Sequence, residues 1–319
     1  MRWLLPLLLG LLAACAHAED TPTAPQGDKR IAISFDDAPR AKGPFLTEDE
    51  RTRLLIEALE NAGVAQAAFF VNPGRVDGPD DERRIADYVD AGHVIANHSA
   101  THPRLSETPL DAYLADLDAA EDWLRGRDGY RPWFRYPFLD EGRQDKEKRD
   151  ALRAALAERG LVNGYVTVEA IDWFYEAAAK RALADGQQVD REALRDLYVE
   201  AHVEAAEFYD GLAREAVGRS PVHMLLLHET DNAALWIDDL VEALRAKGWT
   251  IVGADAAYAD PFALLATTYD TPYAQGTLTE MVAWEKGLPA PRWYRGNDTD
   301  LAQEWFDTRV LGLPPTEND

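Results

Sequence analysis

The sequence predicts an α/β fold, either an α/β barrel or an open doubly wound sheet. For most of the chain, short apolar runs typical of buried strands alternate with longer segments of helical periodicity. Repeated alternation of this kind implies parallel strands joined by right-handed helical crossovers. The 319 residues contain no apparent internal repeat and no linker that would separate two domains. We therefore expect a single domain over residues 29–319.

The strands and helices can be placed in chain order from their periodicity. Apolar runs predict strands at residues 31–35, 65–71, 93–97, 132–136, 161–168, 221–228 and 249–252. Helical periodicity predicts helices near residues 47–63, 80–91, 108–124, 144–159 and 232–247. Each helix lies between two strands, as the crossovers of a parallel sheet require.

Two of these helices carry recognisable end signals. Thr47 and Glu50 form a capping-box signature, and Gly63 marks the far end of the same helix. Thr108 followed by Pro109 predicts an N-cap with proline at the first helical position.

Two segments depart from the alternation. Residues 174–219 are rich in Ala, Glu and Arg and predict a long helical insertion between two strands. The chain from about residue 256 has no clean period and predicts an irregular C-terminal extension that carries Trp284, Trp293 and Trp305. We expect both segments to wall a groove and to set the length of the substrate.

Residues 1–18 have the features of an export signal, because one Arg is followed by an apolar run too short to span a bilayer. Two cleavage patterns are present. Residues 16–18 (A-H-A) fit the small-x-small rule of ordinary secretion, whereas residues 12–15 (L-A-A-C) resemble a bacterial lipoprotein box. The polar, Pro-bearing residues 19–28 predict a linker. We therefore expect an exported protein of the periplasm or cell envelope, with any membrane attachment through a lipid on Cys15.

The formal net charge of −24 at pH 7 limits the possible partners. It argues against nucleic acid, because phosphate binding needs a basic surface, and against electrostatic attachment to anionic lipid. It says little about a neutral ligand such as a sugar. Cys15 is the only cysteine, so no disulfide can form within the chain, and no pattern indicates a protein partner.

Polar side chains gather where the predicted strands end. They are Asp36 and Asp37, Asn97 and His98, Arg135, Asp172, and His228. In α/β folds the carboxyl ends of the strands meet at one face, where functional groups lie. One polar residue after a strand is usually the start of a loop, but polar groups at five strand ends indicate a shared site.

A metal site would explain two adjacent carboxylates at the end of a strand. His98 and His102 stand four residues apart, a spacing that suits zinc on one side of a helical turn but, taken alone, fits two surface histidines better. Together with Asp37 they form a His₂-carboxylate set. The cation would let Asp36 sit beside Asp37, and Asp36 would then take a proton from water that the ion activates.

His228 is the natural general acid. Its strand is otherwise apolar, so the imidazole needs a partner, and as an imidazolium it could protonate a leaving amine. Arg135 and Asp172 could form a salt bridge that orients Asp36, although an ordinary structural ion pair explains them nearly as well.

The other histidines and the C-terminal tryptophans have simpler interpretations. We expect His93 and His223 to pack in or near the core and His202, within the helical insertion, to lie in solvent. The tryptophans are expected to fill the core or cover the barrel, and exposed ones would suit stacking on sugar rings.

Five short motifs resemble, in order, those of polysaccharide deacetylases (carbohydrate esterase family 4, the NodB-homology domain). S-F-D-D-A-P at residues 34–39 resembles T-F-D-D-G-P, H-S-A-T-H at 98–102 matches H-[ST]-x-x-H, and R-Y-P-F at 135–138 resembles R-x-P-Y. I-D-W at 171–173 and L-L-L-H at 225–228 resemble the last two motifs. The resemblance covers roughly residues 29–255 without the insertion. It implies a distorted (β/α) barrel, a Zn²⁺-type ion with Co²⁺ or another divalent ion as alternatives, and hydrolysis of N-acetyl or O-acetyl groups on sugars.

Carried over by position, the resemblance implies a role for each site residue. The roles are Asp36 as base, Asp37, His98 and His102 as metal ligands, Arg135 and Asp172 as tethers of the base, His228 as acid, and the backbone N–H of Phe138 as donor to the oxyanion. Only Phe138 rests on the resemblance alone.

This sequence departs from the family pattern at three places. Ala38 replaces a glycine, and Phe138 replaces a tyrosine. The fourth motif lacks the family's more distant Trp, which leaves Trp173 or Tyr175 as the wall behind His228.

These observations together predict a metal-dependent hydrolase that removes acetyl groups from a saccharide, with N-acetylglucosamine units of chitin oligomers or peptidoglycan as first choice. An O-acetyl xylan esterase and a small-molecule amidohydrolase remain alternatives, because the metal set does not define the leaving group. The export signal argues against the second of these. A non-catalytic sugar-binding barrel fits less well, since a binder has no need for both Asp36 and His228.

Overall fold

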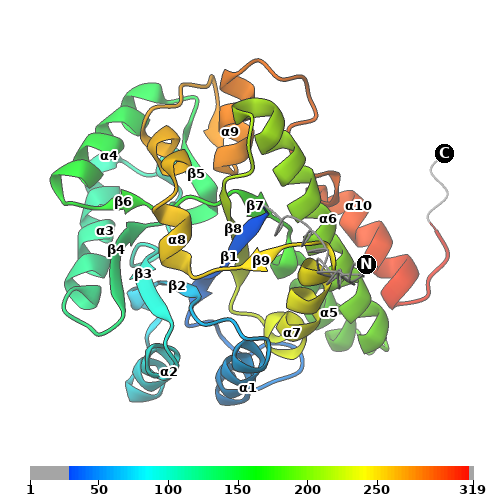
Figure 1. Ribbon diagram of the computed structural model, residues 1–319. Helices are drawn as coiled ribbons and strands as arrows, with labels where there is room; N and C mark the ends of the chain where they lie inside the picture. Colours follow the sequence, from blue (N-terminus) through cyan, green and yellow to red (C-terminus); the bar gives the residue numbers. More distant parts are fainter. Residues whose placement is uncertain (1–28, 316–319) are drawn as a thin grey trace, which may run out of the picture.

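The structure, a computed structural model, describes residues 29–315 and is built around one parallel sheet that curls into a distorted barrel (Figure 1). The sheet order is β6-β4-β3-β2-β1-β8-β7, and β9 pairs with the start of β1. These strands are β1 (Arg30–Ala38), β2 (Ala68–Val71), β3 (Val94–Asn97), β4 (Tyr130–Phe134), β6 (Val162–Asn163), β7 (Val168–Glu169), β8 (Val222–His228) and β9 (Thr250–Ile251). Because every pairing in this sheet is parallel, the carboxyl ends of the strands open at one mouth.

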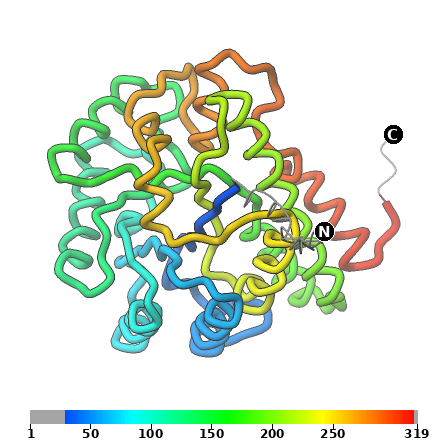
Figure 2. The backbone as a smooth tube through the Cα atoms, in the orientation of Figure 1, coloured from blue at the N-terminus to red at the C-terminus, as the bar shows by residue number. Residues whose placement is uncertain are grey.

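Most helices surround the sheet on its outer side, as the backbone trace in Figure 2 shows, and one short helix, residues 254–258, packs on the interior of the barrel. The helices are α1 (Glu48–Asn61), α2 (Pro79–Asp90), α3 (Leu110–Leu124), α4 (Lys146–Glu158), α5 (Asp172–Ala184), α6 (Arg191–Val217), α7 (Asp231–Ala246), α8 (Ala254–Tyr258), α9 (Leu278–Glu285) and α10 (Thr299–Trp305). A separate antiparallel pair joins β5 (Asp140–Arg143) to β10 (Ala274–Gln275). The expected (β/α) barrel is confirmed.

The two edges of the sheet are joined by the chain itself. The sequence predicted one strand at residues 161–168, and this prediction is wrong, because the segment forms two short strands on opposite edges. β6 pairs with β4, and β7 pairs with β8. Between them, the N–H of Gly164 donates to the carbonyl of Phe134 at 2.7 Å, and that of Thr167 donates to the carbonyl of Met224 at 3.0 Å. A few residues thus close the barrel.

Of the two predicted helix N-caps, Thr47 is confirmed and Thr108 is wrong. Thr47 and Glu50 form the predicted capping box at the start of α1. Thr108, in contrast, is not the N-cap of α3, because its N–H donates to the carbonyl of Leu105 at 3.4 Å and closes a preceding 3₁₀ turn. Pro109 takes the N-cap position instead.

Strand alternation sorts side chains between the barrel interior and the helices. On β1, Ile31, Ile33 and Phe35 belong to the large core shared with α1 and α7. Ala32 belongs to a second cluster that fills the interior with residues of β2, β3, β4 and β8 and is closed by Ala254 and Ala257 of α8. By the two-residue period of a strand, Ser34 and Asp36 share the interior side with Ala32.

The helical insertion is part of the main core. Two helices, α5 and α6, occupy the segment 174–219, and many of their apolar side chains belong to the largest core cluster. His202 on α6 is wholly buried, and its Nδ1 donates to the carbonyl of Tyr198 at 2.6 Å. The expectation that His202 lies in solvent is therefore wrong. His93 and His223 are buried, as expected.

The C-terminal extension is only partly irregular. It forms α9 and α10, and these pack beside α6 and α5 (Figure 1). Trp284 and Trp305 are half-buried, whereas Trp293 is 44% exposed. The predicted export signal, linker and lipidation site at Cys15 lie outside the described residues. Among residues 29–315, no helix is both long and apolar enough to cross a membrane.

A substitution at the barrel closure tests this architecture. A Cβ on Gly164 would lie 2.7 Å from Cε1 of Phe70 and 3.2 Å from the carbonyl carbon of Phe134. Gly164→Ala should lower the free energy of unfolding by about 1–3 kcal/mol in urea titrations, because overpacking strains the barrel.

Gly211→Ala in α6 is the matched control. No atom lies within 4 Å of its would-be Cβ, so this change should stabilise the helix by about 0.5–1 kcal/mol. Equal stability of the two variants would contradict the close approach at Gly164.

Candidate active site

The predicted base and acid are neighbours on adjacent central strands. Asp36 of β1 pairs in register with His228 of β8, and both follow the interior alternation of their strands. Arg135, two residues after the interior residue Trp133, reaches the same space. The side chain of Asp36 is 4% exposed and that of Arg135 is 1% exposed, so this part of the site is nearly dry.

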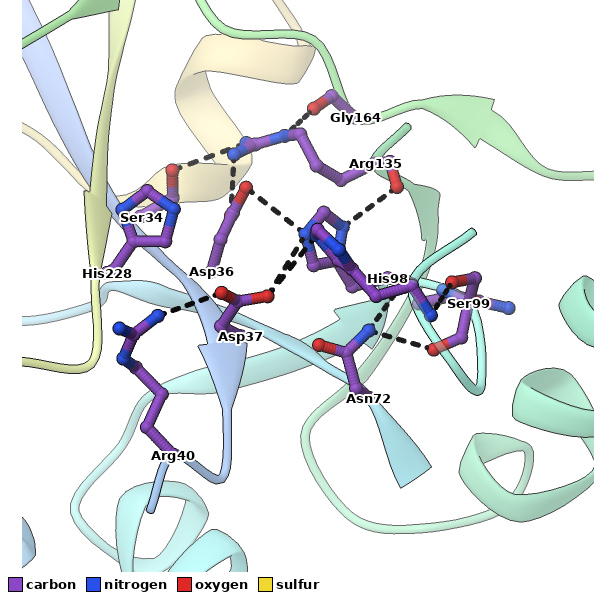
Figure 3. A network of polar contacts seen from close by, with 12 residues as sticks. Ser34, Asp36, Asp37, Arg40, Asn72, His98, Ser99, Arg135, Gly164 and His228 are labelled. Carbon is purple, nitrogen blue, oxygen red and sulfur yellow. Dashed lines mark hydrogen bonds and ion pairs between the residues drawn. The ribbon is translucent and has the colours of Figure 1, made fainter. Parts of the chain in front are cut away.

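A change in backbone conformation brings the second carboxylate to the same side. Consecutive residues of a strand point to opposite faces, but Asp37 has φ of 72° and the β1–β2 register shifts between Phe35 and Ala38. Both Asp36 and Asp37 therefore lie close to His98 (Figure 3). Positive φ at a non-glycine residue costs roughly 1–3 kcal/mol and persists where the surroundings impose it.

The three predicted metal ligands converge. One ligand atom each from Asp37, His98 and His102 lies within 4.8 Å of the others. Asp37 Oδ1 is 3.3 Å from His102 Nε2 and 3.8 Å from His98 Nε2. Burial lowers the pKa of both imidazoles to about 3. At neutral pH each ring is therefore uncharged and has one nitrogen with a free lone pair.

Backbone hydrogen bonds fix the orientation of these histidines. His98 Nδ1 donates to the carbonyl of Arg135 at 2.9 Å, which leaves Nε2 to face Asp37. The Asn72 amide donates to the carbonyls of His98 and Ser99 at 2.6 and 3.0 Å, and Ser99 Oγ accepts from the N–H of His102 at 3.0 Å. Sequence reasoning missed Asn72 and Ser99; the carboxyl-end position of Asn72, directly after β2, was the available signal.

Asp37 has the properties of a ligand for a cation. Its Oδ1 is buried and accepts no hydrogen bond from any described residue. Arg75 Nη1 lies 3.1 Å from Oδ1, and Arg40 Nη1 donates to Oδ2 at 2.8 Å. Burial would raise the pKa of Asp37, but His228, the two neighbouring histidines and Arg75 together hold it well below its usual range. The residues present therefore fit a divalent cation.

Arg135 holds Asp36 without help from Asp172. Its Nη1 donates to Asp36 Oδ1 at 2.7 Å, and its other donors reach Ser34 Oγ, the Tyr258 hydroxyl and the carbonyl of Gly164 (Figure 3). Burial raises the pKa of Asp36, and Arg135 opposes that rise. The salt bridge expected between Arg135 and Asp172 is wrong.

Asp172 contacts the predicted acid instead. His228 Nδ1 donates to Asp172 Oδ1 at 2.7 Å, and the backbone N–H of His228 donates to Oδ2 at 2.7 Å. Burial would lower the pKa of His228, but the carboxylate of Asp172 outweighs it, and the pKa is raised. The Asp172 carboxylate therefore favours the imidazolium form of His228 and leaves Nε2 as the nitrogen available to a substrate.

These groups line one cavity of about 600 Å³. Phe138 lies on its wall, with its ring edge-on to His102 at a centroid separation of 4.4 Å. Trp173 also lines the cavity and is 39% exposed, whereas Tyr175 is buried in the core. Trp173 is therefore the residue that can wall the substrate space. Its role and the backbone role of Phe138 stay predictions.

Glu169 is a cavity residue that sequence reasoning missed. It ends β7 next to Leu226 of β8, and burial raises the pKa of its carboxyl to about 7. It too stands at the carboxyl end of a strand, so the signal used for the other residues would have found it.

With the geometry established, the chain can be compared with known proteins. Residues 23–158 match the family model described as polysaccharide deacetylase. Over these residues the chain is similar to that family, and the match covers less than half of the chain. The matched segment contains Asp36, Asp37, His98, His102 and Arg135, whereas Asp172 and His228 lie beyond it.

One curated relative is a peptidoglycan-N-acetylglucosamine deacetylase from Bacillus cereus, 27% identical over 151 residues. That match covers 47% of this chain, and the chain spans about half the length (49%) of the relative.

Two solved structures are also similar. A family 4 carbohydrate esterase from Streptomyces lividans in complex with acetate has 21% identity and a TM-score of 0.47, covering 72% of this chain and 95% of that one. The peptidoglycan deacetylase PdaC from Bacillus subtilis has 19% identity and a TM-score of 0.46, covering 73% and 91%. Likeness at this level identifies no substrate.

The His228–Asp172 pair predicts a shift in titration. Asp172→Asn removes the negative charge that raises the pKa of His228 and leaves the opposing effect of burial, so the pKa should fall. His228 would then lose its proton at a lower pH. NMR titration of the His228 ring measures this directly.

Asp210→Asn serves as the control, because Asp210 contacts His223 at 3.3 Å and, within residues 29–315, forms no hydrogen bond or ion pair with His228. A pKa of His228 that stayed the same in Asp172→Asn would show that the carboxylate does not set it.

Proposed function

We propose that this protein is a divalent-metal-dependent deacetylase that hydrolyses the N-acetyl group of N-acetylglucosamine units in a saccharide, either peptidoglycan or chitin oligomers. One observation carries the proposal. The Asp37–His98–His102 cluster shares a single cavity with an arginine-held carboxylate, Asp36, and a carboxylate-held imidazole, His228. The match of residues 23–158 to the polysaccharide deacetylase model supports the same reaction class.

Asp37, His98 and His102 would hold the ion, most simply Zn²⁺. When bound, the ion would supply positive charge against the acetyl carbonyl oxygen and lower the pKa of water. The neutral imidazoles suit this role, because ligation requires unprotonated nitrogen.

Asp36 acts as the general base. Arg135 fixes one carboxylate oxygen, and the raised pKa of Asp36 brings its basicity closer to neutral pH. Asp36 takes a proton from the attacking water, whose oxygen forms a bond to the acetyl carbon.

His228 acts as the general acid on the neighbouring strand. Asp172 accepts the hydrogen bond from His228 Nδ1, which leaves Nε2 of the imidazolium toward the cavity. Nε2 gives its proton to the leaving nitrogen as the C–N bond breaks. The products are acetate and a free amino sugar. The two roles differ because Arg135 favours the ionised form of the Asp36 carboxyl, whereas Asp172 favours the protonated form of the His228 imidazole.

A second hollow borders the cavity, and together they would suit a substrate longer than one sugar. A polar hollow of about 840 Å³ shares Asp37 and Arg40 with the 600 Å³ cavity and is lined further by Lys42, Arg75 and Lys180. An O-acetyl ester would fit the same groups, so an acetylxylan esterase is the second candidate.

Substitutions at Asp37 and Asp36 separate metal binding from proton transfer. Asp37→Ala and His102→Ala should lose bound metal, measured by elemental analysis of protein purified without chelator. Asp36→Asn should retain metal and lose acetate release by about 10²–10⁴-fold, because the base is gone.

Glu57→Gln on the exposed face of α1 is a control that should retain both properties. Acetate release should be measured on chitin oligomers, peptidoglycan and acetylxylan. Acetate release by Asp36→Asn at the parent rate would overturn the assignment of the base.

We also propose that the protein is exported and lies in the periplasm or cell envelope. The support is the signal-like pattern of residues 1–18, which lie outside the described part of the chain. If Cys15 is lipidated, Cys15→Ser should move the protein from the membrane to the soluble fraction and abolish incorporation of labelled fatty acid. A soluble parent protein without label would instead identify ordinary secretion.

A further inference from the structure

An arginine at the rim of the catalytic cavity is held in place with its hydrogen-bond donors unused. Arg104 lines the cavity and directly follows the loop that carries His102. Its guanidinium carbon lies 3.5 Å from the centroid of the Phe138 ring. Because that ring is itself edge-on to His102, Arg104 lies one aromatic ring farther out than the metal ligands.

No described residue accepts a hydrogen bond from the Arg104 guanidinium at normal distance. Its nearest carboxylate is Glu107, with 3.9 Å between Arg104 Nε and Glu107 Oε1. The same Glu107 oxygen is 3.9 Å from Arg143 Nη1, and the Glu107 side chain is 63% exposed. One loosely placed carboxylate therefore serves two arginines, which leaves excess positive charge at this rim.

This arrangement differs from that of the other cavity arginine. Arg40 donates to Asp37 at 2.8 Å and to Glu176 at 3.4 Å, so its donors are committed to the protein. Arg104 is fixed by stacking alone, which orients a planar guanidinium without using its N–H groups. A guanidinium held flat with free donors suits a planar carboxylate, which can accept two parallel hydrogen bonds.

We propose that Arg104 binds a carboxylate carried by the sugar next to the one whose acetyl group reacts, so that the substrate is an anionic saccharide. The inference rests on the proposed deacetylase function and narrows its substrate class. The distance of one aromatic ring from His102 places the contact on a neighbouring sugar rather than on the acetyl group. A polymer with a lactyl ether carboxylate on alternate sugars (N-acetylmuramic acid) has this chemistry, and a chain of N-acetylglucosamine alone does not.

Matched oligosaccharides test the proposal. The three substrates are a tetramer of N-acetylglucosamine, a tetramer alternating with N-acetylmuramic acid, and the methyl ester of that second tetramer. We expect kcat/KM for acetate release to be about tenfold higher for the free carboxylate than for its ester, as for one charge-assisted hydrogen bond. Arg104→Gln should reduce this ratio to about one, and Arg104→Lys should give an intermediate ratio because it keeps the charge and loses the planar fork.

Arg53→Gln, which breaks an exposed pair with Glu57 on α1, is the matched control and should leave the ratio unchanged. Metal content of each variant shows whether His102 is disturbed. Calorimetric binding of the carboxylate and ester tetramers to the parent and Arg104→Gln proteins gives a readout that needs no turnover.

The outcomes separate the two proposals. Acetate release with a ratio insensitive to Arg104→Gln would overturn the carboxylate contact alone and leave Arg104 as a packing residue on Phe138. Absence of acetate release from all substrates would overturn the deacetylase function, whereas the binding ratio would still decide the role of Arg104. Equal binding of the acid and ester tetramers by the parent protein would also overturn the proposed contact between Arg104 and the carboxylate.

Discussion

The site depends on how negative charge is held inside a nearly dry cavity. Three carboxylates, Asp36 and Asp37 near the end of β1 and Asp172 at the start of α5, lie around the same mouth and are largely shielded from water. A buried charge without a partner costs several kcal/mol, so each has its own cationic or hydrogen-bonding neighbour. Arg135 holds Asp36, Arg40 and Arg75 flank Asp37, and His228 holds Asp172.

This pairing also sets the chemistry. Arg135 is anchored by Ser34, Tyr258 and Gly164, so the orientation of Asp36 depends on contacts from several strands and loops. Asp37 is different, because one of its oxygens is buried without a hydrogen bond. The carboxylate that the protein leaves incompletely satisfied is the one best placed for a cation.

Backbone strain is concentrated at the same place. Asp37, Ser99, His102 and Phe138 all have positive φ, between 58° and 72°. Each such residue costs roughly 1–3 kcal/mol and persists only where its surroundings impose the conformation. Hydrogen bonds from Asn72 and Ser99 supply that fixation for the histidine loop. The strain lets side chains from a strand end and a loop converge, which regular strand geometry would prevent.

The strand-end rule explains most of what could be predicted from the sequence. Apolar runs predicted the central strands, and the parallel arrangement then brought Asp36, His98, Arg135 and His228 together. The rule says nothing about which polar groups pair, because pairing depends on side-chain reach across the barrel. Asp172 was for that reason assigned to Arg135 instead of His228.

Two other predictions from the sequence, the exposure of His202 and the single strand at residues 161–168, also failed because they depend on tertiary packing. His202 was expected in solvent because its helix is rich in charged residues, but the burial of one helical face depends on tertiary packing that the sequence pattern shows poorly. Residues 161–168 were predicted as one strand because an apolar run carries no sign of which edge it joins. Gly164, which lies close to Phe70 and Phe134, marks the position where the chain crosses between the edges.

The helical insertion is tied to the chemistry as well as to the walls of the cavity. Its first helix, α5, begins at Asp172, the residue that holds the acid, and continues with Trp173 and Ala177 on the cavity wall. Glu176 of the same helix accepts from Arg40 at 3.4 Å and from the backbone N–H of Asp231 at 2.7 Å. A shift of α5 would therefore move the acid, the wall and the arginine beside Asp37 together. In the proposed mechanism, a change in this insertion would therefore act on both the substrate space and proton transfer, because α5 carries residues of both.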